Sequence, residues 1–339
     1  MKHTRFKFSH ATTDYFFNGK FSHLKRIVNA KNAVIITDKN VFRKQPKLFI
    51  GWKCIVIKAG EKHKTQTTVD EVISQLIKLG ADRKTVLIGV GGGVVTDVTG
   101  YVASVYLRGV SFGFIPTSIL AMVDAGIGGK NGVDVGIYKN MVGTIRQPQF
   151  ILYDTKLLQT LPVNEWRNGF AEIIKHACIL DAGLFRELEV NDIKTYQNDR
   201  RLLNDLIERN ARLKTKVVQR DEFENGDRRL LNFGHTLGHA LENQYQLLHG
   251  FAVSIGMVMA AKISTSRAQF KETPRLVSLL KRYGLPAEMD FDRTKAFENL
   301  TSDKKRINQE MNFVILEKIG RARVMRLPFR ELRQLINQL

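Results

Sequence analysis

The chain is poor in cysteine and has no long hydrophobic run. Its two cysteines, Cys54 and Cys178, exclude a disulfide framework and fit a reducing compartment. The longest apolar stretch, residues 251–261, contains Ser254 and falls well short of the roughly 20 residues that a membrane-spanning helix needs. The opening residues, MKHTRFKFSH, lack the apolar core of a signal peptide. We therefore expect a soluble, cytoplasmic protein that does not engage a membrane.

Acidic residues are also in short supply. The chain has 53 lysines and arginines against 33 aspartates and glutamates, which gives a formal net charge of +20 at pH 7. The basic residues are spread along the chain without long runs, and no known DNA- or RNA-binding motif accompanies them. This distribution argues against a nucleic-acid partner. Because a basic surface attracts anionic small molecules, we expect an anionic substrate.

Length and composition indicate a globular protein of two domains. At 339 residues the chain is long for a single core, and its 43% hydrophobic and 25% charged residues are close to the average for folded proteins. The first half alternates β-rich runs with a helical pattern, which is typical of a parallel sheet in an α/β fold. We predict a helix at residues 69–79 and strands at residues 33–38, 53–58, 85–90, 111–116 and 150–154.

The second half is mainly helical in its pattern. Strand-like runs occur only at residues 313–316 and 321–327, whereas helices are predicted at residues 164–180, 200–220, 233–244, 251–270 and 274–283. We therefore predict a boundary near residue 160. It separates a Rossmann-like parallel-sheet domain, residues 1–160, from a mostly α-helical domain, residues 161–339.

A glycine-rich loop follows the third predicted strand and opens a helical stretch. In residues 89–97, GVGGGVVTD, the glycines let the backbone approach a pyrophosphate, which the N–H groups and dipole of the next helix stabilise. Val94 occupies the last glycine position of G-x-G-x-x-G, and the better acidic candidate for a ribose, Asp38, comes before the loop. The loop indicates nucleotide binding, with a tight strand-to-helix turn as the alternative.

A second glycine-rich segment, residues 124–140, reads DAGIGGKNGVDVGIYKN and has no convincing periodicity. We predict a long loop there, and long ordered loops in compact domains are usually functional. It can present Asp124, Lys130, Lys139 and Asn140, and two lysines among glycines suit a phosphate. A flexible surface loop is the alternative.

Three of the eight histidines fall in residues 228–250, RRLLNFGHTLGHALENQYQLLHG. His235 and His239 stand four apart, on one face of a helix, and His249 follows ten residues later. A carboxylate with two imidazoles and an open position is a common way to hold a catalytic Zn²⁺. The spacing offers His235 with His239 as one chelating pair. It offers Glu172 with His176, on the helix predicted at 164–180, as another, and does not choose between them.

Six motifs together carry a resemblance to a known family. They are GGGVVTD, PTSILAMVDAGIGGKNG, KNMVG, GFAEIIKHACI, RRLLNFGHTLGHALE and HGFAVSIGMVMA. In order and spacing they resemble the 3-dehydroquinate synthases of the sugar-phosphate cyclase superfamily, over roughly residues 38–305. The resemblance implies an NAD-binding first domain and a metal- and substrate-binding second domain.

The resemblance also implies a reaction of the shikimate pathway. Members of the family convert 3-deoxy-D-arabino-heptulosonate 7-phosphate to 3-dehydroquinate and phosphate. The steps are transient oxidation by bound NAD, elimination of phosphate, return of the hydride and intramolecular aldol closure. Because the hydride returns, NAD is not consumed.

Individual roles carry over by position in the motifs. One divalent metal, Zn or Co, is expected on Glu172, His235 and His249. This set of ligands replaces the chelating pair of His235 and His239. Catalytic roles fall on Asp124, Lys139, Lys175 and His239. The expected cofactor contacts are Asp38, Glu61, Lys64, Gly92, Gly93, Asp97, Thr117, Ser118, Lys130 and Lys139. The expected substrate contacts are Arg108, Lys130, Asn140, Lys175, Lys214, Arg228, Asn232, His239 and either Lys304 or Lys305.

The carry-over divides the substrate contacts by anion and implies a homodimer. Lys214 and Arg228 match the carboxylate side, with Asn232 nearby, and Lys130, Asn140 and His239 match the phosphate side. Arg108 matches an arginine that reaches a neighbouring subunit's site. The chain departs from the family pattern at four positions, which are Thr96, Ser118, Asp134 and Phe251.

Two related enzyme classes are the alternatives. One is a cyclase of the 2-deoxy-scyllo-inosose synthase type, which acts on a sugar phosphate without a carboxylate. The other is a metal-dependent oxidoreductase of the glycerol dehydrogenase type, which would release NADH. The set of carboxylate-binding residues favours the 3-dehydroquinate synthase interpretation.

Overall fold

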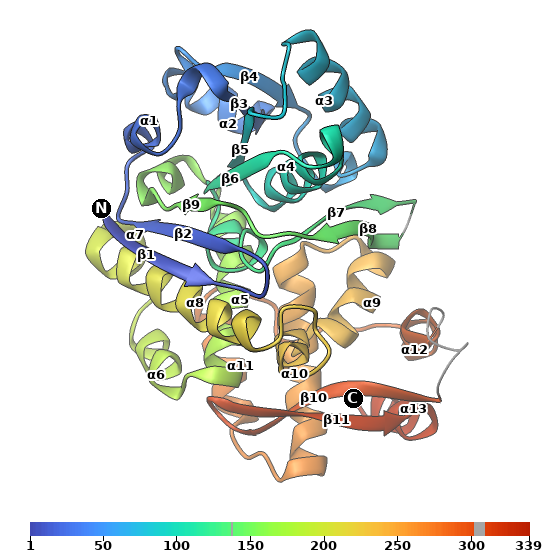
Figure 1. Ribbon diagram of the computed structural model, residues 1–339. Helices are drawn as coiled ribbons and strands as arrows, with labels where there is room; N and C mark the ends of the chain where they lie inside the picture. Colours follow the sequence, from blue (N-terminus) through green and yellow to red (C-terminus); the bar gives the residue numbers. More distant parts are fainter. Residues whose placement is uncertain (137, 302–308) are drawn as a thin grey trace. The chain divides into compact units, whose positions relative to one another are not determined.

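The computed structural model of the chain describes residues 1–136, 138–301 and 309–339 (Figure 1). The chain packs as two compact units, and each is discontinuous in sequence. The first comprises Met1–Glu165 and Arg200–Glu222, and the second comprises Trp166–Asp199 and Phe223–Leu339. This division differs from the single boundary predicted near residue 160.

Helix α8 (Arg200–Arg220) accounts for the difference. It comes from the helical half of the sequence but packs with the first unit. Its buried Thr215 donates a hydrogen bond to the hydroxyl of Tyr15 at 3.0 Å, and Arg212 donates to Thr4 at 2.9 Å. Both partners lie on the first two strands of the chain, so α8 covers that part of the first unit (Figure 1).

A seven-stranded sheet forms the centre of the first unit, in the order β1-β2-β9-β6-β5-β3-β4. All neighbouring strands run parallel except β1 and β2, which form an antiparallel pair. The strands are β1 (Lys2–Lys7), β2 (Thr12–Phe17), β3 (Ala33–Asp38), β4 (Lys53–Ile57), β5 (Val86–Gly91), β6 (Ser111–Pro116) and β9 (Phe150–Leu152). The five predicted strands and the parallel α/β class are confirmed. The β1–β2 pair was not predicted.

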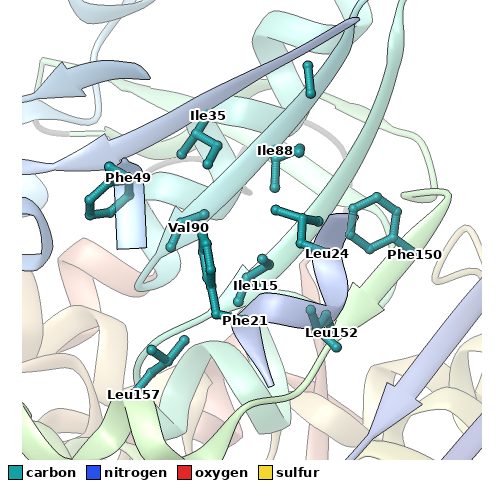
Figure 2. Close-up of a cluster of buried hydrophobic side chains, with 11 residues drawn as sticks. Phe21, Leu24, Ile35, Phe49, Ile88, Val90, Ile115, Phe150, Leu152 and Leu157 are labelled. Carbon is teal, nitrogen blue, oxygen red and sulfur yellow. The ribbon is translucent and has the colours of Figure 1, made fainter. Parts of the chain in front are cut away.

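The central strands are buried on both faces, as in other parallel sheets. Figure 2 shows Ile35, Ile88, Val90 and Ile115 from three neighbouring strands in one apolar cluster with Phe21. The helices of this unit are α1 (Leu24–Ile27), α2 (Lys39–Lys44), α3 (Gln66–Lys78), α4 (Gly93–Val105) and α8.

Strands β7 (Lys130–Val135) and β8 (Tyr138–Ile145) pair in an antiparallel arrangement, which we call the β7–β8 hairpin. The loop predicted at residues 124–140 is therefore wrong over most of its length. Its first residues end a short π-helix, Ala121–Ala125, and the strands begin at Lys130. Glycines hid the strands, because glycine has low β-propensity. Here they are needed, since a Cβ at Gly132 or Gly143 would collide with the backbone of the opposite strand.

The second unit is mainly helical, as predicted. Its helices are α5 (Val163–Leu180, entering from the first unit), α6 (Ala182–Val190), α7 (Ile193–Asn198), α9 (His235–Tyr245), α10 (His249–Ala268), α11 (Thr273–Arg282), α12 (Arg293–Thr301) and α13 (Phe329–Asn337). An antiparallel pair, β10 (Glu310–Lys318) and β11 (Arg321–Pro328), confirms the two late strands. None of the helices among the described residues has the length and apolarity to cross a membrane.

Candidate active site

Three neighbouring strands of the first unit end at one edge of the sheet, and predicted cofactor residues follow each of them. Asp38 closes β3, the glycine loop follows β5, and Thr117 and Ser118 follow β6. The carboxyl edge of a parallel sheet is where such folds bind nucleotides. Asp38 also caps α2, because its Oδ1 accepts hydrogen bonds from the amides of Asn40 at 2.7 Å and Val41 at 3.1 Å.

Close packing constrains Gly91 of this loop more than Gly92 and Gly93. A Cβ at Gly91 would lie 2.4 Å from Val95 Cγ2. An added Cβ at Gly92 would lie 3.4 Å from Ser118 Oγ, and one at Gly93 would lie 3.3 Å from the Cβ of Ala125. Gly92 is also the N-cap of α4, so the first turn of that helix points its N–H groups out of the sheet edge. A backbone surface of this kind can bind a pyrophosphate.

Lys64 organises a cluster of charged side chains beside the loop. It is 4% exposed, and its Nζ lies 2.7 Å from Glu61, 3.6 Å from Asp97 and 3.5 Å from Asp134, and donates to Asn140 Oδ1 at 2.9 Å. Burial would lower the pKa of Lys64, but the carboxylates of Asp97 and Glu61 raise it well above its ordinary value. Burial raises the pKa of Asp97 to about 7, and Lys64 offsets only part of that shift. Three carboxylates thus share one ammonium group.

Asp134 connects strands β7 and β8 to this cluster. Its Oδ1 accepts a hydrogen bond from the amide of Asn140 at 2.8 Å, and its own amide donates to the carbonyl of Lys64 at 2.8 Å. Burial raises the pKa of Asp134, and Lys64 opposes that shift. The departure from the family pattern at this position therefore adds a carboxylate to a cluster that has a single lysine at its centre.

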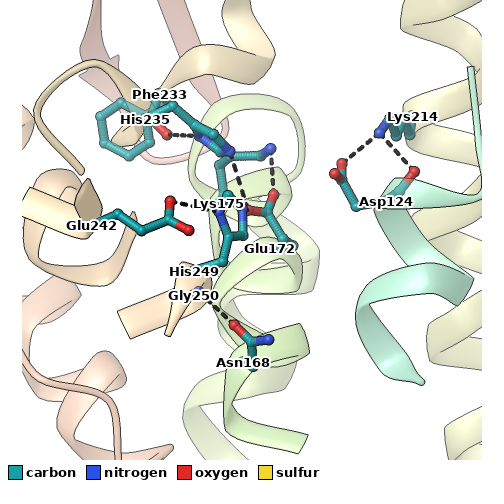
Figure 3. Close-up of polar contacts among 10 residues, drawn as sticks. All are labelled: Asp124, Asn168, Glu172, Lys175, Lys214, Phe233, His235, Glu242, His249 and Gly250. Carbon is teal, nitrogen blue, oxygen red and sulfur yellow. Dashed lines mark hydrogen bonds and ion pairs between the residues drawn. The ribbon is translucent and has the colours of Figure 1, made fainter. Parts of the chain in front are cut away.

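Lys214 and Asp124 form an ion pair in the first unit. The Nζ of Lys214, on α8, donates to Asp124 Oδ1 at 2.6 Å and to its carbonyl oxygen at 2.8 Å (Figure 3). Asp124 lies on the π-helix Ala121–Ala125. Asp124 was predicted to be catalytic and Lys214 to bind the substrate carboxylate. The two residues therefore contact each other directly, although separate roles were predicted for them.

In the second unit, Glu172, His235 and His249 converge on one point. One ligand atom from each lies within 4.8 Å of the others. Glu172 Oε1 is 3.3 Å from His235 Nε2 and 3.2 Å from His249 Nε2 (Figure 3). The sequence spacing had offered two chelating pairs, Glu172 with His176 and His235 with His239. The group contains Glu172 from the first pair and His235 from the second. Two imidazole nitrogens facing one buried carboxylate oxygen are suitable donors for a divalent cation such as Zn²⁺.

The close crossing of α9 and α10 brings the two imidazoles together. Gly234 precedes α9 at a positive φ of 79°, and Gly256 of α10 packs against it. A Cβ at Gly256 would collide with the carbonyl oxygen of Gly234 and lie 2.8 Å from the amide of Gly238. The two helices can approach this closely only because glycine has no side chain.

Buried charges set the electrostatics of this centre. Glu172 is fully buried, which alone would raise its pKa, but Lys175 and His235 hold the pKa well below its usual range. Lys175 makes an ion pair with Glu172 one turn along α5. Burial and the positive charge of Lys175 lower the pKa of His235. Burial also opposes charge on His249, yet hydrogen bonds to Glu172 and Glu242 raise its pKa to about 10. Glu172 therefore stays ionised and able to bind a cation.

His239 is part of the same histidine cluster but is not a member of the group formed by Glu172, His235 and His249. Its ring centroid is 5.2 Å from that of His235 and 5.9 Å from that of His249, and its side chain is exposed. It also belongs to a second group of possible metal donors, with Glu242 and His249.

The other predicted residues lie at several places. Arg228 is buried, 2% exposed, on the 3-10 turn Asp227–Asn232, and Asn232 donates to Glu224 Oε1 at 2.6 Å. Arg108 is exposed, with a positive φ of 65°. Lys304 and Lys305 lie outside the described residues. Lys130 is exposed at the start of β7, Lys139 is half-buried on β8, and Thr96 and Phe251 are buried and half-buried on α4 and α10.

Two residues at the centre were not predicted. Glu242 Oε2 is hydrogen-bonded to His249 Nδ1 at 3.2 Å, and Asn168 Oδ1 accepts a hydrogen bond from the amide of Gly250 at 2.5 Å (Figure 3). Helical spacing carried a signal for both. Glu242 lies seven residues after His235, and Asn168 four before Glu172, which puts each on the same helix face as a predicted ligand.

Comparisons with known proteins identify the family of the chain. Family models described as 3-dehydroquinate synthase N-terminal and C-terminal match residues 54–168 and 169–306. A 3-dehydroquinate synthase of Pyrococcus abyssi is 42% identical over 287 residues, which cover 84% of this chain and 85% of that protein.

Solved structures match over the whole chain. A 2-epi-5-epi-valiolone synthase from Streptomyces hygroscopicus, with NAD⁺ and Zn²⁺ bound, has a TM-score of 0.86 at 26% identity, covering 100% of this chain and 99% of that one. A 2-deoxy-scyllo-inosose synthase complexed with carbaglucose-6-phosphate, NAD⁺ and Co²⁺ has a TM-score of 0.84 at 23% identity, covering 99% and 100%. Both family models and the curated relative give the same name, and the chain belongs to the 3-dehydroquinate synthase family.

Proposed function

We propose that the chain is a 3-dehydroquinate synthase, which converts 3-deoxy-D-arabino-heptulosonate 7-phosphate to 3-dehydroquinate and phosphate in the shikimate pathway. The observation that carries this proposal is the convergence of Glu172, His235 and His249 in a chain of this family. Family membership gives the reaction, and the convergence supports the metal centre that the reaction needs. Identity of 42% with a curated 3-dehydroquinate synthase supports the same assignment.

We assign the metal to Glu172, His235 and His249, and NAD to the carboxyl edge of the first unit's sheet. The structural relative with NAD⁺ and Zn²⁺ bound supports this pair of cofactors, and a second relative carries Co²⁺. When bound, NAD accepts and returns a hydride, and the metal ion polarises substrate hydroxyl or carbonyl oxygens. The cofactor contacts that we propose are Asp38, Glu61, Lys64, Gly92, Gly93, Asp97, Thr117, Ser118, Lys130 and Lys139.

The substrate has two anionic groups, and the chain offers cations and donors for both. For the carboxylate we propose Lys214 in the first unit and, in the second, Arg228 with Asn232. Arg228 is buried, and a buried guanidinium is suited to a charge-assisted, bidentate contact with a carboxylate. For the phosphate we propose Lys130 and Asn140 in the first unit and His239 in the second, with Lys304 or Lys305.

The chain's own residues hold charge in defined places during the reaction. Lys175 keeps Glu172 ionised through their ion pair, so a metal ligand is not lost to protonation near neutral pH. Asp124 holds Lys214 by two hydrogen bonds and so orients a cation for the substrate. Lys139 and His239 complete the catalytic residues that we propose. No side chain is assigned as the base for elimination, because the departing phosphate can take the proton itself.

The direct test is formation of the carbocyclic product. The purified chain with NAD and Zn²⁺ is expected to convert 3-deoxy-D-arabino-heptulosonate 7-phosphate to 3-dehydroquinate, with glucose 6-phosphate as the control substrate. Turnover of glucose 6-phosphate alone would assign the chain to the 2-deoxy-scyllo-inosose synthase type instead. Oxidation of glycerol with release of NADH would assign it to the dehydrogenase type.

We propose further that the enzyme is a cytoplasmic homodimer. Strand β8 has β7 as its neighbour in a two-stranded sheet, and its Met141 and Val142 are exposed. Exposed apolar side chains on an edge strand are typical of a surface that pairs with another chain. The exposed Arg108 supports the same proposal. Light scattering should give twice the chain mass of 38.6 kDa, and a single chain mass would contradict the dimer.

A further inference from the structure

His249 is held between two carboxylates, one on each side of its ring. Its Nε2 lies 3.2 Å from Glu172 Oε1, and its Nδ1 lies 3.2 Å from Glu242 Oε2 (Figure 3). Glu172 comes from α5 and Glu242 from α9, whereas His249 begins α10. Three helices of the second unit therefore meet at one imidazole.

Glu242 is buried, with 5% of its surface exposed. Burying a carboxylate costs free energy unless a partner stabilises its charge, so we expect Glu242 to have a partner that does so. It lies two helical turns beyond His235, on the face of α9 that turns toward His249. The partner it finds there is the imidazole whose other nitrogen faces the proposed metal position.

The two ring nitrogens of a histidine are not independent. When Nδ1 carries the proton and donates it to a carboxylate, Nε2 is left with its lone pair for a metal ion. A carboxylate has acceptor oxygens and no proton of its own, so Glu242 keeps the proton on Nδ1 and favours the tautomer whose Nε2 lone pair is available when a metal ion binds. That tautomer leaves Nε2 facing Glu172, where the third ligand, His235, also points.

The backbone of His249 is fixed as well as its ring. Asn168, one turn before Glu172 on α5, accepts a hydrogen bond from the amide of Gly250 at 2.5 Å. A Cβ at Gly250 would collide with the backbone of Asn168, so α10 begins in close contact with α5. Asn168 sets where the helix starts, which leaves the ring orientation of His249 to be fixed by its Nδ1 partner.

We propose that Glu242 is a positioning residue for the metal centre, which orients His249 and holds the proton on its Nδ1 so that Nε2 binds the metal. The inference rests on the proposed function, because it requires a metal on Glu172, His235 and His249. The inference adds Glu242 to the site as a residue that affects metal binding through the ligand His249. Partners of this kind typically change metal affinity by about 10- to 100-fold when they are removed.

A different role for Glu242 is available and must be separated from this one. Glu242 also lies within 4.8 Å of donor atoms of His239 and His249, so it has the geometry of a direct metal ligand. A ligand and a positioning residue respond differently to glutamine. Glutamine keeps an oxygen that can accept from Nδ1–H, but it is a poor substitute for a carboxylate bound to Zn²⁺.

The experiment measures Zn²⁺ affinity of the full chain by competition with a chromophoric chelator, for wild type, E242A and E242Q. A matched control is E222A, because Glu222 is a buried glutamate of the first unit that accepts from Gln147 and from the amide of Ser9. Thermal unfolding of the metal-free proteins reports any general loss of stability. The visible spectrum of the Co²⁺-loaded proteins reports the ligand field.

The expected order of affinity is wild type, then E242Q, then E242A, with E242A weakened by about 10- to 100-fold and E242Q recovering part of the loss. The Co²⁺ spectrum should change in E242A and return toward wild type in E242Q. E222A should lose thermal stability and keep wild-type affinity. If E242A does not fold, the comparison of E242Q with wild type still decides, because the proposal requires weaker binding in E242Q.

Two results would overturn the inference. Wild-type affinity in both Glu242 variants would show that Glu242 does not position His249. Complete loss of metal in E242Q as well as E242A would make Glu242 a ligand. A wild-type chain that binds no Zn²⁺ would instead remove the proposed function, and the inference with it, so the two failures are distinguishable.

Discussion

Replacing Gly256 with alanine tests how the metal centre is assembled, because this glycine lies where α9 and α10 cross. An added Cβ would collide with the carbonyl of Gly234 and lie 2.8 Å from the amide of Gly238, and both are backbone atoms. Backbone atoms cannot rotate aside as a side chain can. The helices must therefore separate by roughly 1 Å, which is the scale on which a supported site loses its geometry.

Two opposing effects set the magnitude for G256A. Alanine in a helix interior is more favourable than glycine by about 1 kcal/mol, whereas overpacking a core costs about 1–3 kcal/mol. We expect a net loss of up to about 2 kcal/mol in the free energy of unfolding. Metal affinity should fall more clearly, by about tenfold or more, which corresponds to about 1.4 kcal/mol, because His235 and His249 come from the two helices that separate.

Urea unfolding of the metal-free protein and chelator competition with Zn²⁺ measure the two effects of G256A. The matched control is A260G, one turn further along the same helix at a buried alanine. A260G should lose about 1 kcal/mol of stability through helix propensity and keep wild-type metal affinity. A G256A protein with wild-type affinity and raised stability would refute the reasoning.

Three further outcomes follow from the site. After dialysis, metal analysis should find stoichiometric Zn²⁺ in H239A but none in H235A or H249A, and metal loss in H239A would restore the chelate of histidines four apart. R228A should weaken binding of the carboxylated substrate by about 2 kcal/mol or more and that of glucose 6-phosphate far less, and equal losses would contradict the substrate assignment. D97N should gain stability over wild type as pH rises from 5 to 7.5, in thermal melts. Burial raises the pKa of Asp97 to about 7 in the folded protein, so the unfolded chain binds fewer protons at this group than the folded chain does. Wild-type stability therefore falls as the pH rises, whereas D97N lacks this group. A stability difference between the two proteins that stays constant with pH would contradict this.

The strands of the parallel sheet were predictable because each is a short, continuous apolar run. Residues 33–38 and 111–116 are buried on both faces, so the sequence itself reports their environment. The β7–β8 hairpin was not predictable on that basis. Its strands are held by glycines that permit close backbone approach, at Gly132 and Gly143, and glycine gives no propensity signal for a strand.

The metal centre was only partly predictable from spacing. Spacing identified His235 and His239 as a pair on one helix face, but the convergent group combines His235 with Glu172 and His249 from two other helices. Contacts between elements distant in sequence depend on how helices cross, which no local period encodes. Resemblance to the family supplied that combination.

Local spacing did not single out Glu242. It lies on the same face of α9 as His235, but acidic residues on a helix are usually solvated, so the spacing alone gave no reason to choose it. Its burial and its distance from His249 Nδ1 distinguish it from a surface glutamate. These are properties of the packed structure.

The most direct test of the proposed activity compares phosphate release with NADH accumulation in one reaction. The chain is incubated with Zn²⁺, excess NAD and 3-deoxy-D-arabino-heptulosonate 7-phosphate, while phosphate and NADH absorbance are followed together. A 3-dehydroquinate synthase returns the hydride within each turnover, so phosphate should accumulate with substrate consumed and NADH should not. Steady accumulation of NADH in proportion to substrate consumed would contradict the account and indicate a dehydrogenase.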